Sequence, residues 1–174
     1  YNIPIQYLMT MCNYITSIDT IIFDPKYNEP LNPELLANYK KIIFSNYKLC
    51  DKLFEACEDD NSKPFENSKN FEYSSSDFNC SLYNSLDKCT TLTHIVFGYW
   101  FNQPLADSLD NCISLTHIVF DTRFSQPLAN SLDNCTVLTH INFGHKFNYP
   151  LCDFLYNHPL LVHLGLGYYF NQKV

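Results

Sequence analysis

The chain has 174 residues, of which 46% are hydrophobic and 16% aromatic, and this is enough for one domain with a continuous core. Its 18 acidic residues outnumber its 11 basic ones, giving a formal net charge of −7, and Arg123 is its single arginine. This balance argues against nucleic acid, which is bound through clustered cations. No apolar run reaches the ~20 residues that span a bilayer, which argues against a membrane partner.

The first predicted element is a short amphipathic helix in residues 4–13. Its apolar side chains follow the i, i+3, i+4, i+7 spacing of one helical face, and Pro4 suits the first helical position. The outermost repeat of a stacked protein exposes apolar side chains unless something covers them. We therefore expect residues 1–17 to form an N-terminal helical cap on the repeats that follow.

From residue 18 onward the chain repeats a unit of 23 residues. The clearest copy runs from Leu92 to Gly98 (LTHIVFG) and continues, after two variable residues, with Phe101 to Leu105 (FNQPL). A fixed period of this length is the signature of copies that stack on one another. The same positions recur 23 residues apart at Leu115, Leu138 and Leu161 and at Phe124, Phe147 and Phe170.

Each copy contributes one strand to a predicted parallel sheet. Alternate residues of a strand share a face, so Ile95 and Phe97 should point inward while His94, Val96 and Gly98 point to solvent. A single copy cannot bury its inward residues, whereas copies stacked about 4.8 Å apart can. The expected strands lie near residues 18–24, 39–45, 69–74, 92–98, 115–121, 138–144 and 161–167.

Weaker copies precede the clear ones, and one segment fits none of them. The run from Tyr27 to Leu31 (YNEPL) and the run from Phe78 to Leu82 (FNCSL) resemble FNQPL. The acidic segment 58–69 reads as an inserted loop, either solvated or used for docking. The predicted fold is mainly β with short helical or irregular segments: a leucine-rich-repeat-like, right-handed solenoid of about seven parallel strands in residues 18–174.

A polar residue follows each bend of the chain. Asn102 and Asn148 occupy this position in two copies, and a buried asparagine there can bond backbone groups of the neighbouring copy. Ser125 takes the place between them, so the ladder is predicted to weaken at that copy.

The outward face carries one histidine per copy: His94, His117, His140 and His163. Three interpretations stand side by side: a polar ladder without a ligand, a pH-sensitive binding face, and a metal site. Adjacent imidazoles disfavour a second charge, so protonation should spread below the usual pKa near 6.5. Zinc prefers tetrahedral ligands, whereas a straight column offers them from one side, so no metal is expected.

The two residues before each repeated phenylalanine vary while their surroundings repeat. Tryptophan, tyrosine and arginine, which supply most of the binding energy at interfaces, are prominent among them. We expect these positions to bind a protein partner; the alternative is that their long side chains cover the coil above. They are Lys26, Tyr99, Trp100, Thr122, Arg123, His145, Lys146, Tyr168 and Tyr169.

The eight cysteines are expected to be reduced. Cys89, Cys112 and Cys135 share one repeat position, where a buried thiol packs as a small apolar residue. Free thiols predict a reducing compartment and so a cytoplasmic location. The alternative is a secreted, oxidised protein, for which Asn79 and Asn134 lie in matches to glycosylation sequons.

These motifs resemble a known family. The pattern Leu-x-x-Ile-x-Phe, followed four residues later by Phe-Asn-Gln-Pro-Leu, is similar to the FNIP repeat, strongly over residues 86–174 and weakly over 18–85. Ser125 departs from it at Asn and Tyr27 departs from it at Phe. The run from Asn111 to Ile118 (NCISLTHI) is also similar to BspA-like leucine-rich repeats.

The resemblance implies a function as well as a fold. FNIP repeats are common in amoebae and their large DNA viruses, often behind an F-box. The resemblance therefore implies target recognition for an F-box-type ubiquitin ligase, in the host cytoplasm if the chain is viral. No F-box is discernible in this sequence. The BspA-like similarity implies an alternative, an extracellular adhesin.

The repeat pattern predicts a protein-interaction scaffold, not an enzyme. Catalysis needs different groups at one point, whereas tandem copies supply the same group repeatedly. No phosphate loop, nucleophile elbow or zinc-protease motif occurs, so no cofactor is expected. A structural alternative uses the open C-terminal turn, near Phe170, to stack on another copy.

Overall fold

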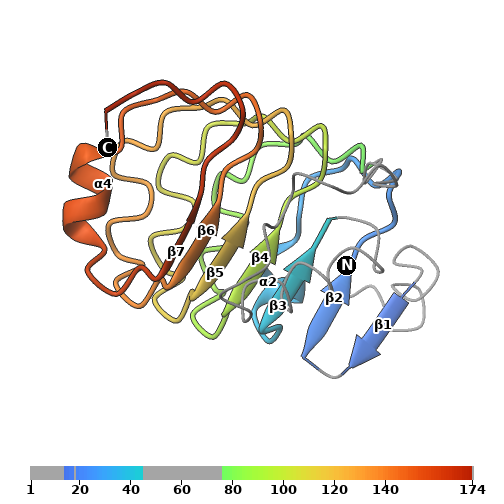
Figure 1. The fold of residues 1–174 in the computed structure, drawn as a ribbon. Helices are drawn as coiled ribbons and strands as arrows, with labels where there is room; N and C mark the ends of the chain where they lie inside the picture. Colours follow the sequence, from blue (N-terminus) through green and yellow to red (C-terminus); the bar gives the residue numbers. More distant parts are fainter. Residues whose placement is uncertain (1–13, 18, 45–75, 174) are drawn as a thin grey trace.

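Six short parallel strands, one from each turn of the chain, line one side of the structure (Figure 1). The computed structural model describes residues 14–17, 19–44 and 76–173. The parallel strands are β2 (Thr20–Ile22), β3 (Lys41–Ile43), β4 (His94–Val96), β5 (His117–Val119), β6 (His140–Asn142) and β7 (His163–Gly165), and β1 (Tyr14–Ser17) pairs antiparallel with β2 at the edge.

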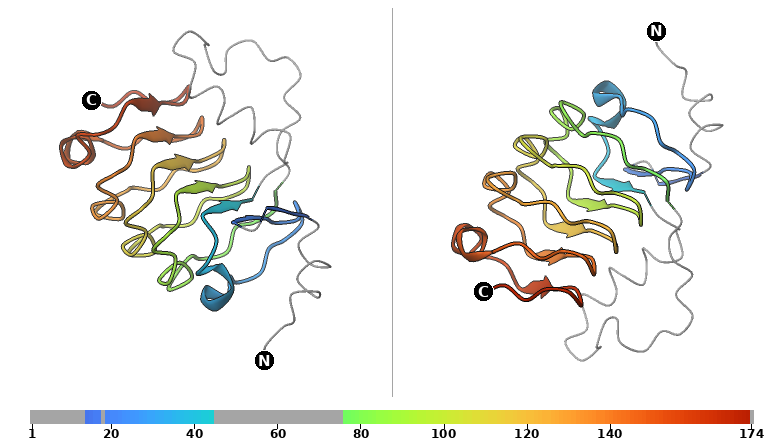
Figure 2. Two further views of the ribbon diagram at one scale, coloured as in Figure 1. Left: turned by 90° about the horizontal axis from the view of Figure 1, so that it is seen from below. Right: turned by 90° about the horizontal axis from the view of Figure 1, so that it is seen from above.

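The strands stack in the register that the 23-residue period predicts. His94 pairs with His117, His117 with His140, and His140 with His163. Figure 2 shows the successive turns, which we call coils, lying one above the next as a β-solenoid. Side chains 23 positions apart therefore occupy equivalent places, and the stacked-repeat prediction is confirmed.

The structure corrects the predicted strands. The parallel sheet has six strands instead of seven, and each described parallel strand has three residues, because the chain bends away soon after pairing. β3 pairs directly with β4, so no strand from residues 69–74 lies between them. The helical cap in 4–13, the loop 58–69 and the strand 69–74 fall outside the described residues, and 14–17 form a strand within the span predicted as a cap.

The coil that begins with β3 contains an insertion at its first corner. Within the later coils, Phe97 and Phe101 have ring centroids 4.1 Å apart. Phe44 contacts Phe78 in the same way, also at 4.1 Å. The first pair is 4 positions apart in the sequence and the second is 34, so this corner holds 30 additional residues. β3 and the segment that begins at Phe78 therefore belong to one coil.

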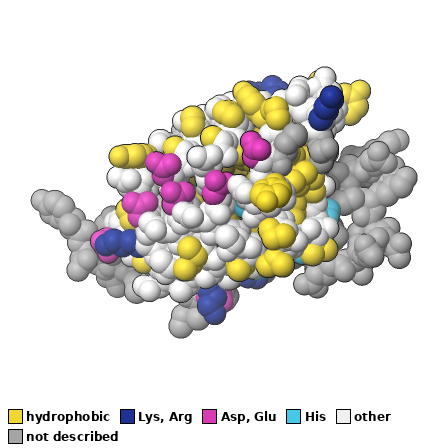
Figure 3. All heavy atoms as spheres, turned by 90° about the vertical axis from the view of Figure 1, so that its left-hand side faces the viewer, with side chains coloured by type: hydrophobic (Ala, Val, Ile, Leu, Met, Phe, Trp, Pro, Cys, Tyr) yellow, Lys and Arg dark blue, Asp and Glu magenta, His cyan; other side chains and the backbone are white. Residues whose placement is uncertain are grey.

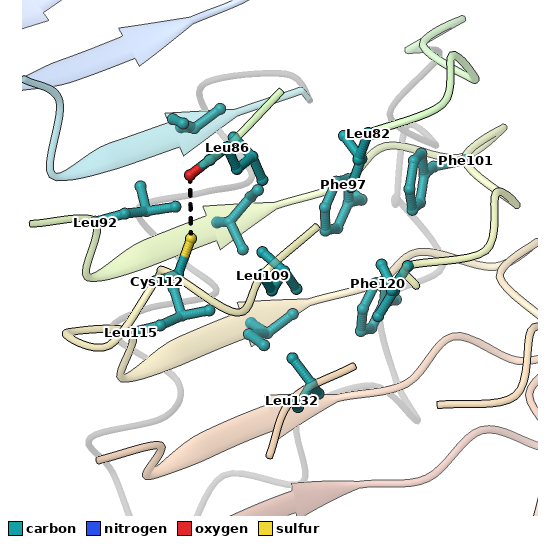
Figure 4. Close-up of a cluster of buried hydrophobic side chains, with 14 of the residues drawn as sticks. Leu82, Leu86, Leu92, Phe97, Phe101, Leu109, Cys112, Leu115, Phe120 and Leu132 are labelled. Atoms are coloured by element: carbon teal, nitrogen blue, oxygen red, sulfur yellow. Dashed lines mark hydrogen bonds between the residues drawn. The ribbon is translucent and has the colours of Figure 1, made fainter. Parts of the chain in front are cut away.

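The interior is filled by columns of identical side chains, one per coil (Figure 4). Phe97 and Phe120 stack with centroids 5.2 Å apart, and Phe120 and Phe143 at 5.8 Å. Leu92 and Leu115 are fully buried beside them. Each such side chain gains about 1.5–3 kcal/mol on burial, so every stacked coil is stabilised by its member of each column.

The predicted asparagine ladder runs along one corner and is broken where expected. The Asn102 Oδ1 accepts the Ser125 N–H at 2.8 Å, and the Asn148 Oδ1 accepts the Asn171 N–H at 2.9 Å. Asn28 and Asn79 form the earlier rungs in the same way. In the described part of the chain, no equivalent bond joins the Ser125 side chain to the Asn148 N–H.

Two short helices occur among the described residues, on the side opposite the sheet. In α2 (Pro33–Leu36), proline opens the helix and the Asn32 side chain accepts the Glu34 N–H at 3.0 Å. α4 (Cys152–Asn157) lies in the last coil (Figure 1). Neither has the length or hydropathy of a membrane-spanning helix, and this holds for the described residues only.

Candidate partner-binding surface

The four predicted histidines lie together as one column on the outer face of the sheet. Each is the first residue of its strand and is half-buried. Ring centroids are 4.3 Å apart between His94 and His117 and between His117 and His140, and 5.8 Å between His140 and His163. The planes of the first three are within 7° of their neighbours, so the imidazoles stack face to face.

A threonine next to each of the first three histidines fixes its tautomer. The hydroxyl of Thr116 donates its hydrogen to the Thr93 carbonyl at 3.0 Å. Its oxygen lies 2.9 Å from Nδ1 of His117. Since the hydroxyl hydrogen is already used, the threonine oxygen accepts, and Nδ1 of the neutral ring must carry the donated hydrogen. The same pairs recur at His94 and His140.

Three histidines of the column, His94, His117 and His163, have a pKa below the usual value. Burial is the main cause that lowers the pKa of His94 to about 3 and that of His117 to about 4, and neighbouring imidazoles and Lys41 lower both further. Burial and then His140 lower the pKa of His163. The direction agrees with the sequence-based expectation, but desolvation outweighs the mutual repulsion on which that expectation rested. His94 and His117 therefore stay neutral well below pH 6.

Next to the histidine column, the outer face of the sheet is more deeply buried than the sequence predicts. Val96, which was expected to point to solvent, is 1% exposed. It belongs to a second buried cluster with Ile22, Ile43 and Val119. The alternation of the strand is as predicted, but the assumption that its outward side faces water is wrong for β2 to β5. No group of three or more metal-ligating side chains occurs in the described ranges.

The strongest contacts at the variable positions centre on Arg123. Its guanidinium carbon lies 3.7 Å from the centroid of the Trp100 ring and 5.2 Å from that of Tyr99. Tyr99 and Trp100 meet edge to face. The Nε of Arg123 is buried and has no hydrogen-bond partner in the described part of the chain. The two aromatic rings therefore hold the cation in a fixed place, mostly by cation–π contact.

The variable positions of the next two coils lie along the same edge of the solenoid as Arg123. The Lys146 N–H donates to the Thr122 carbonyl at 3.1 Å, and the Tyr169 N–H to that of His145 at 3.1 Å. Tyr168 and Tyr169 meet edge to face and are 85% and 60% exposed. These backbone bonds fix the spacing of the side chains. We call this edge the turn-edge surface; it consists of the side chains of Tyr99, Trp100, Arg123, Lys146, Tyr168 and Tyr169.

The cations of this edge form no ion pair with an acidic side chain among residues 14–17, 19–44 and 76–173. No ion pair in the described residues involves Lys26, Arg123 or Lys146, although the chain carries a net charge of −7. Lys26 is exposed at the same edge two coils before Trp100, and Asp77 occupies the equivalent position in the coil between them. Cations that stay unpaired in an acidic protein are available to an acidic partner.

The sequence reasoning missed His158, which completes the cysteine column. It lies 23 positions after Cys135 and is 2% exposed. Its Nε2 is 2.9 Å from the Leu132 carbonyl, while the Cys135 thiol donates to the equivalent Leu109 carbonyl. Both side chains link one coil to the coil before it. The period itself was the signal that would have found His158.

The cysteines themselves are free and buried at Cys89, Cys112 and Cys135. Burial, with smaller contributions from nearby acidic groups, raises the thiol pKa of Cys89 to about 11 and that of Cys135 to about 12. Burial raises that of Cys112 as well. A thiol that stays protonated at neutral pH is a poor nucleophile, so these side chains serve packing and bonding between coils.

A scan against protein-family models finds no match for this chain, and a search of curated proteins finds none either. The FNIP resemblance therefore stands on the quoted motifs alone.

Proposed function

We propose that this protein is a non-enzymatic interaction scaffold that binds an acidic segment of a partner protein through the turn-edge surface. The observation that carries the proposal is the Trp100–Arg123 stack, which holds an unpaired cation in place at a solvent-facing edge. Fixing a side chain before binding reduces the entropy lost on association. Arginine and tryptophan are also the residue types enriched in binding hot spots.

The chemistry of the edge indicates what the partner carries. Carboxylates pair with the outward N–H groups of Arg123 and with Lys146, because guanidinium and ammonium groups bind them through charge-assisted hydrogen bonds. The exposed rings of Tyr168 and Tyr169 offer apolar area to side chains between those carboxylates. Target selection for a ubiquitin ligase, which the FNIP resemblance implies, is one use of such a surface.

The test is to compare the recovery of binding partners by wild-type protein and by edge variants. Trp100→Ala removes the ring that holds the guanidinium, and Arg123→Ala removes the cation. We expect each to weaken binding at least tenfold, since hot-spot truncations cost about 2 kcal/mol or more. Ile113→Ala, at a 57% exposed site away from this edge, is the control. Undiminished recovery with both edge variants would refute the proposal.

A further inference from the structure

The coils repeat at a constant spacing along the turn-edge surface. An aromatic residue directly follows the second variable position of each coil, and these rings stack with centroids 6.0–6.2 Å apart from Tyr27 to Phe170. From Phe78 onward, the planes of neighbouring rings differ by only 3–5°. Successive coils are therefore related by an almost pure translation at this corner, and the residues just before the rings form a straight line at the same spacing.

The residue types along this line follow a definite order. Trp100 is followed by Arg123 and Lys146 in the next two coils, and Tyr169 takes the coil after them. Lys146 is exposed, and Trp100 is 42% exposed although the guanidinium of Arg123 lies over its ring. The line therefore offers an aromatic ring, two cations and a second aromatic ring, one per coil.

Acidic residues limit how much negative charge the edge accepts. Asp77 lies one coil before Trp100 in the same line, so a third carboxylate on that side would meet a like charge, which disfavours it. Burial, and then Asp107 and Asp133, raise the pKa of Asp110, so these carboxylates form a group of their own. On the face drawn in Figure 3, acidic side chains (magenta) gather apart from the cationic ones (dark blue) at its upper margin. The edge suits two carboxylates on adjacent coils, not a long polyanion.

The spacing of the line indicates the conformation of the bound segment. Alternate residues of an extended strand lie on one face and are about 6.6–6.8 Å apart, close to the coil spacing of 6.0–6.2 Å. Over three steps the difference reaches roughly 2 Å, which the long side chains of Arg123 and Lys146 can follow. An α-helix rises about 6.0 Å over four residues but turns about 40° beyond a full turn, so its side chains leave a straight line. A strand fits the edge better than a helix does.

We propose that the acidic segment of the partner binds as an extended strand along the coils, with apolar, acidic, acidic and apolar side chains at alternate residues. In that order, these side chains face Trp100, Arg123, Lys146 and Tyr169. The two carboxylates accept charge-assisted hydrogen bonds from the cations, and the apolar side chains pack on the rings. This inference rests on the proposed function and adds to it the spacing and order of the partner's side chains.

The first experiment compares two capped peptides of identical composition by calorimetric titration of the whole chain at ~20 mM salt, where screening is weak. Leu-Ser-Asp-Ser-Asp-Ser-Leu has the proposed order, whereas Leu-Asp-Ser-Ser-Ser-Asp-Leu places both carboxylates on the opposite face of a strand. We expect the first to bind about tenfold more tightly, because the second loses two charge contacts. Equal affinities would overturn this inference and leave the proposed function standing, since partner recovery with Trp100→Ala and Arg123→Ala tests that function separately.

The second experiment reverses one charge in the line. Lys146→Glu should weaken binding of the first peptide about tenfold, and a peptide with lysine in place of one aspartate should restore it. The aspartate whose replacement restores binding gives the direction of the strand. Lys40→Glu makes the same change in net charge at an exposed site just before β3 and is the control that should bind as the wild type does. Failure of both exchanged peptides, or tighter binding of Asp-Ser-Asp-Ser-Asp-Ser-Asp than of the first peptide, would also overturn the inference.

Discussion

Replacing Ser125 by asparagine should stabilise the protein, because it completes the amide ladder. The rungs on either side join an asparagine Oδ1 to the N–H of the next coil at 2.8 Å for Asn102 and 2.9 Å for Asn148. Ser125 lies at the same register position and is half-buried, as both asparagines are. Its shorter side chain leaves the Asn148 N–H without this acceptor.

The expected gain follows from one additional hydrogen bond at a half-buried site, which contributes about 0.5–1.5 kcal/mol net. For a chain of this size, that corresponds to an increase in Tm of roughly 2–5 °C. Urea unfolding measures the free energy. Amide hydrogen exchange gives a local readout, since 1 kcal/mol slows exchange of the Asn148 N–H about fivefold.

The matched comparison is Asn102→Ser, which removes an existing rung. This variant should lose about 1–3 kcal/mol, because the Ser125 N–H and the Gln126 side chain both lose an acceptor. If Ser125→Asn leaves both the unfolding free energy and the exchange of Asn148 unchanged while Asn102→Ser is destabilising, the ladder does not extend as the register implies, and the reasoning is refuted.

Three further predictions concern strain, protonation and thiol reactivity. Ala106→Gly should raise the unfolding free energy by about 1 kcal/mol, since residue 106 has a φ of 44°. Ala37→Gly, at a right-handed φ of −52°, should lower the unfolding free energy. A change of the same sign in both variants would contradict this reasoning. Burial lowers the pKa of His94 to about 3. The contribution of the neutral ring to stability is therefore complete above pH ~6.5, the pKa in the unfolded chain, and is lost as the pH falls toward 3. His94→Asn should make the free energy of urea unfolding less pH-dependent between pH 7 and 4, and an unchanged pH dependence would count against this. Alkylation of the native protein should modify Cys80, which is partly exposed, before Cys112, which is fully buried; equal rates without denaturant would show that the column opens readily.

The sequence was sufficient to predict the stacking of coils, because the inward positions recur with little variation. Leu92 and Leu115 lie 23 apart and are buried alike, and the histidines pair in register as the period requires. The ladder defect at Ser125 followed from the same comparison. Where one residue type repeats at one spacing, the pattern determines its neighbour in space as well as in sequence.

The errors came where tertiary contacts, not periodicity, decide the outcome. A seventh parallel strand was expected between β3 and β4, yet these two strands pair directly, and the ring contact between Phe44 and Phe78 shows that the coil of β3 continues at Phe78. Val96 alternates as an outward residue but is buried. The stack of Arg123 on Trp100 joins positions that had been selected for their variability, and variability alone gives no information on their contact.

The corner between Phe44 and Phe78 has a consequence for redesign. Lengthening a closed segment from 4 to 34 residues costs only about 2 kcal/mol of ring-closure entropy, because that cost grows with the logarithm of length. The ring contact at this corner has the same separation as its counterpart at Phe97 and Phe101. Foreign sequence, such as an epitope or a reporter peptide, can therefore be grafted at this corner while the aromatic contact that closes the coil is kept.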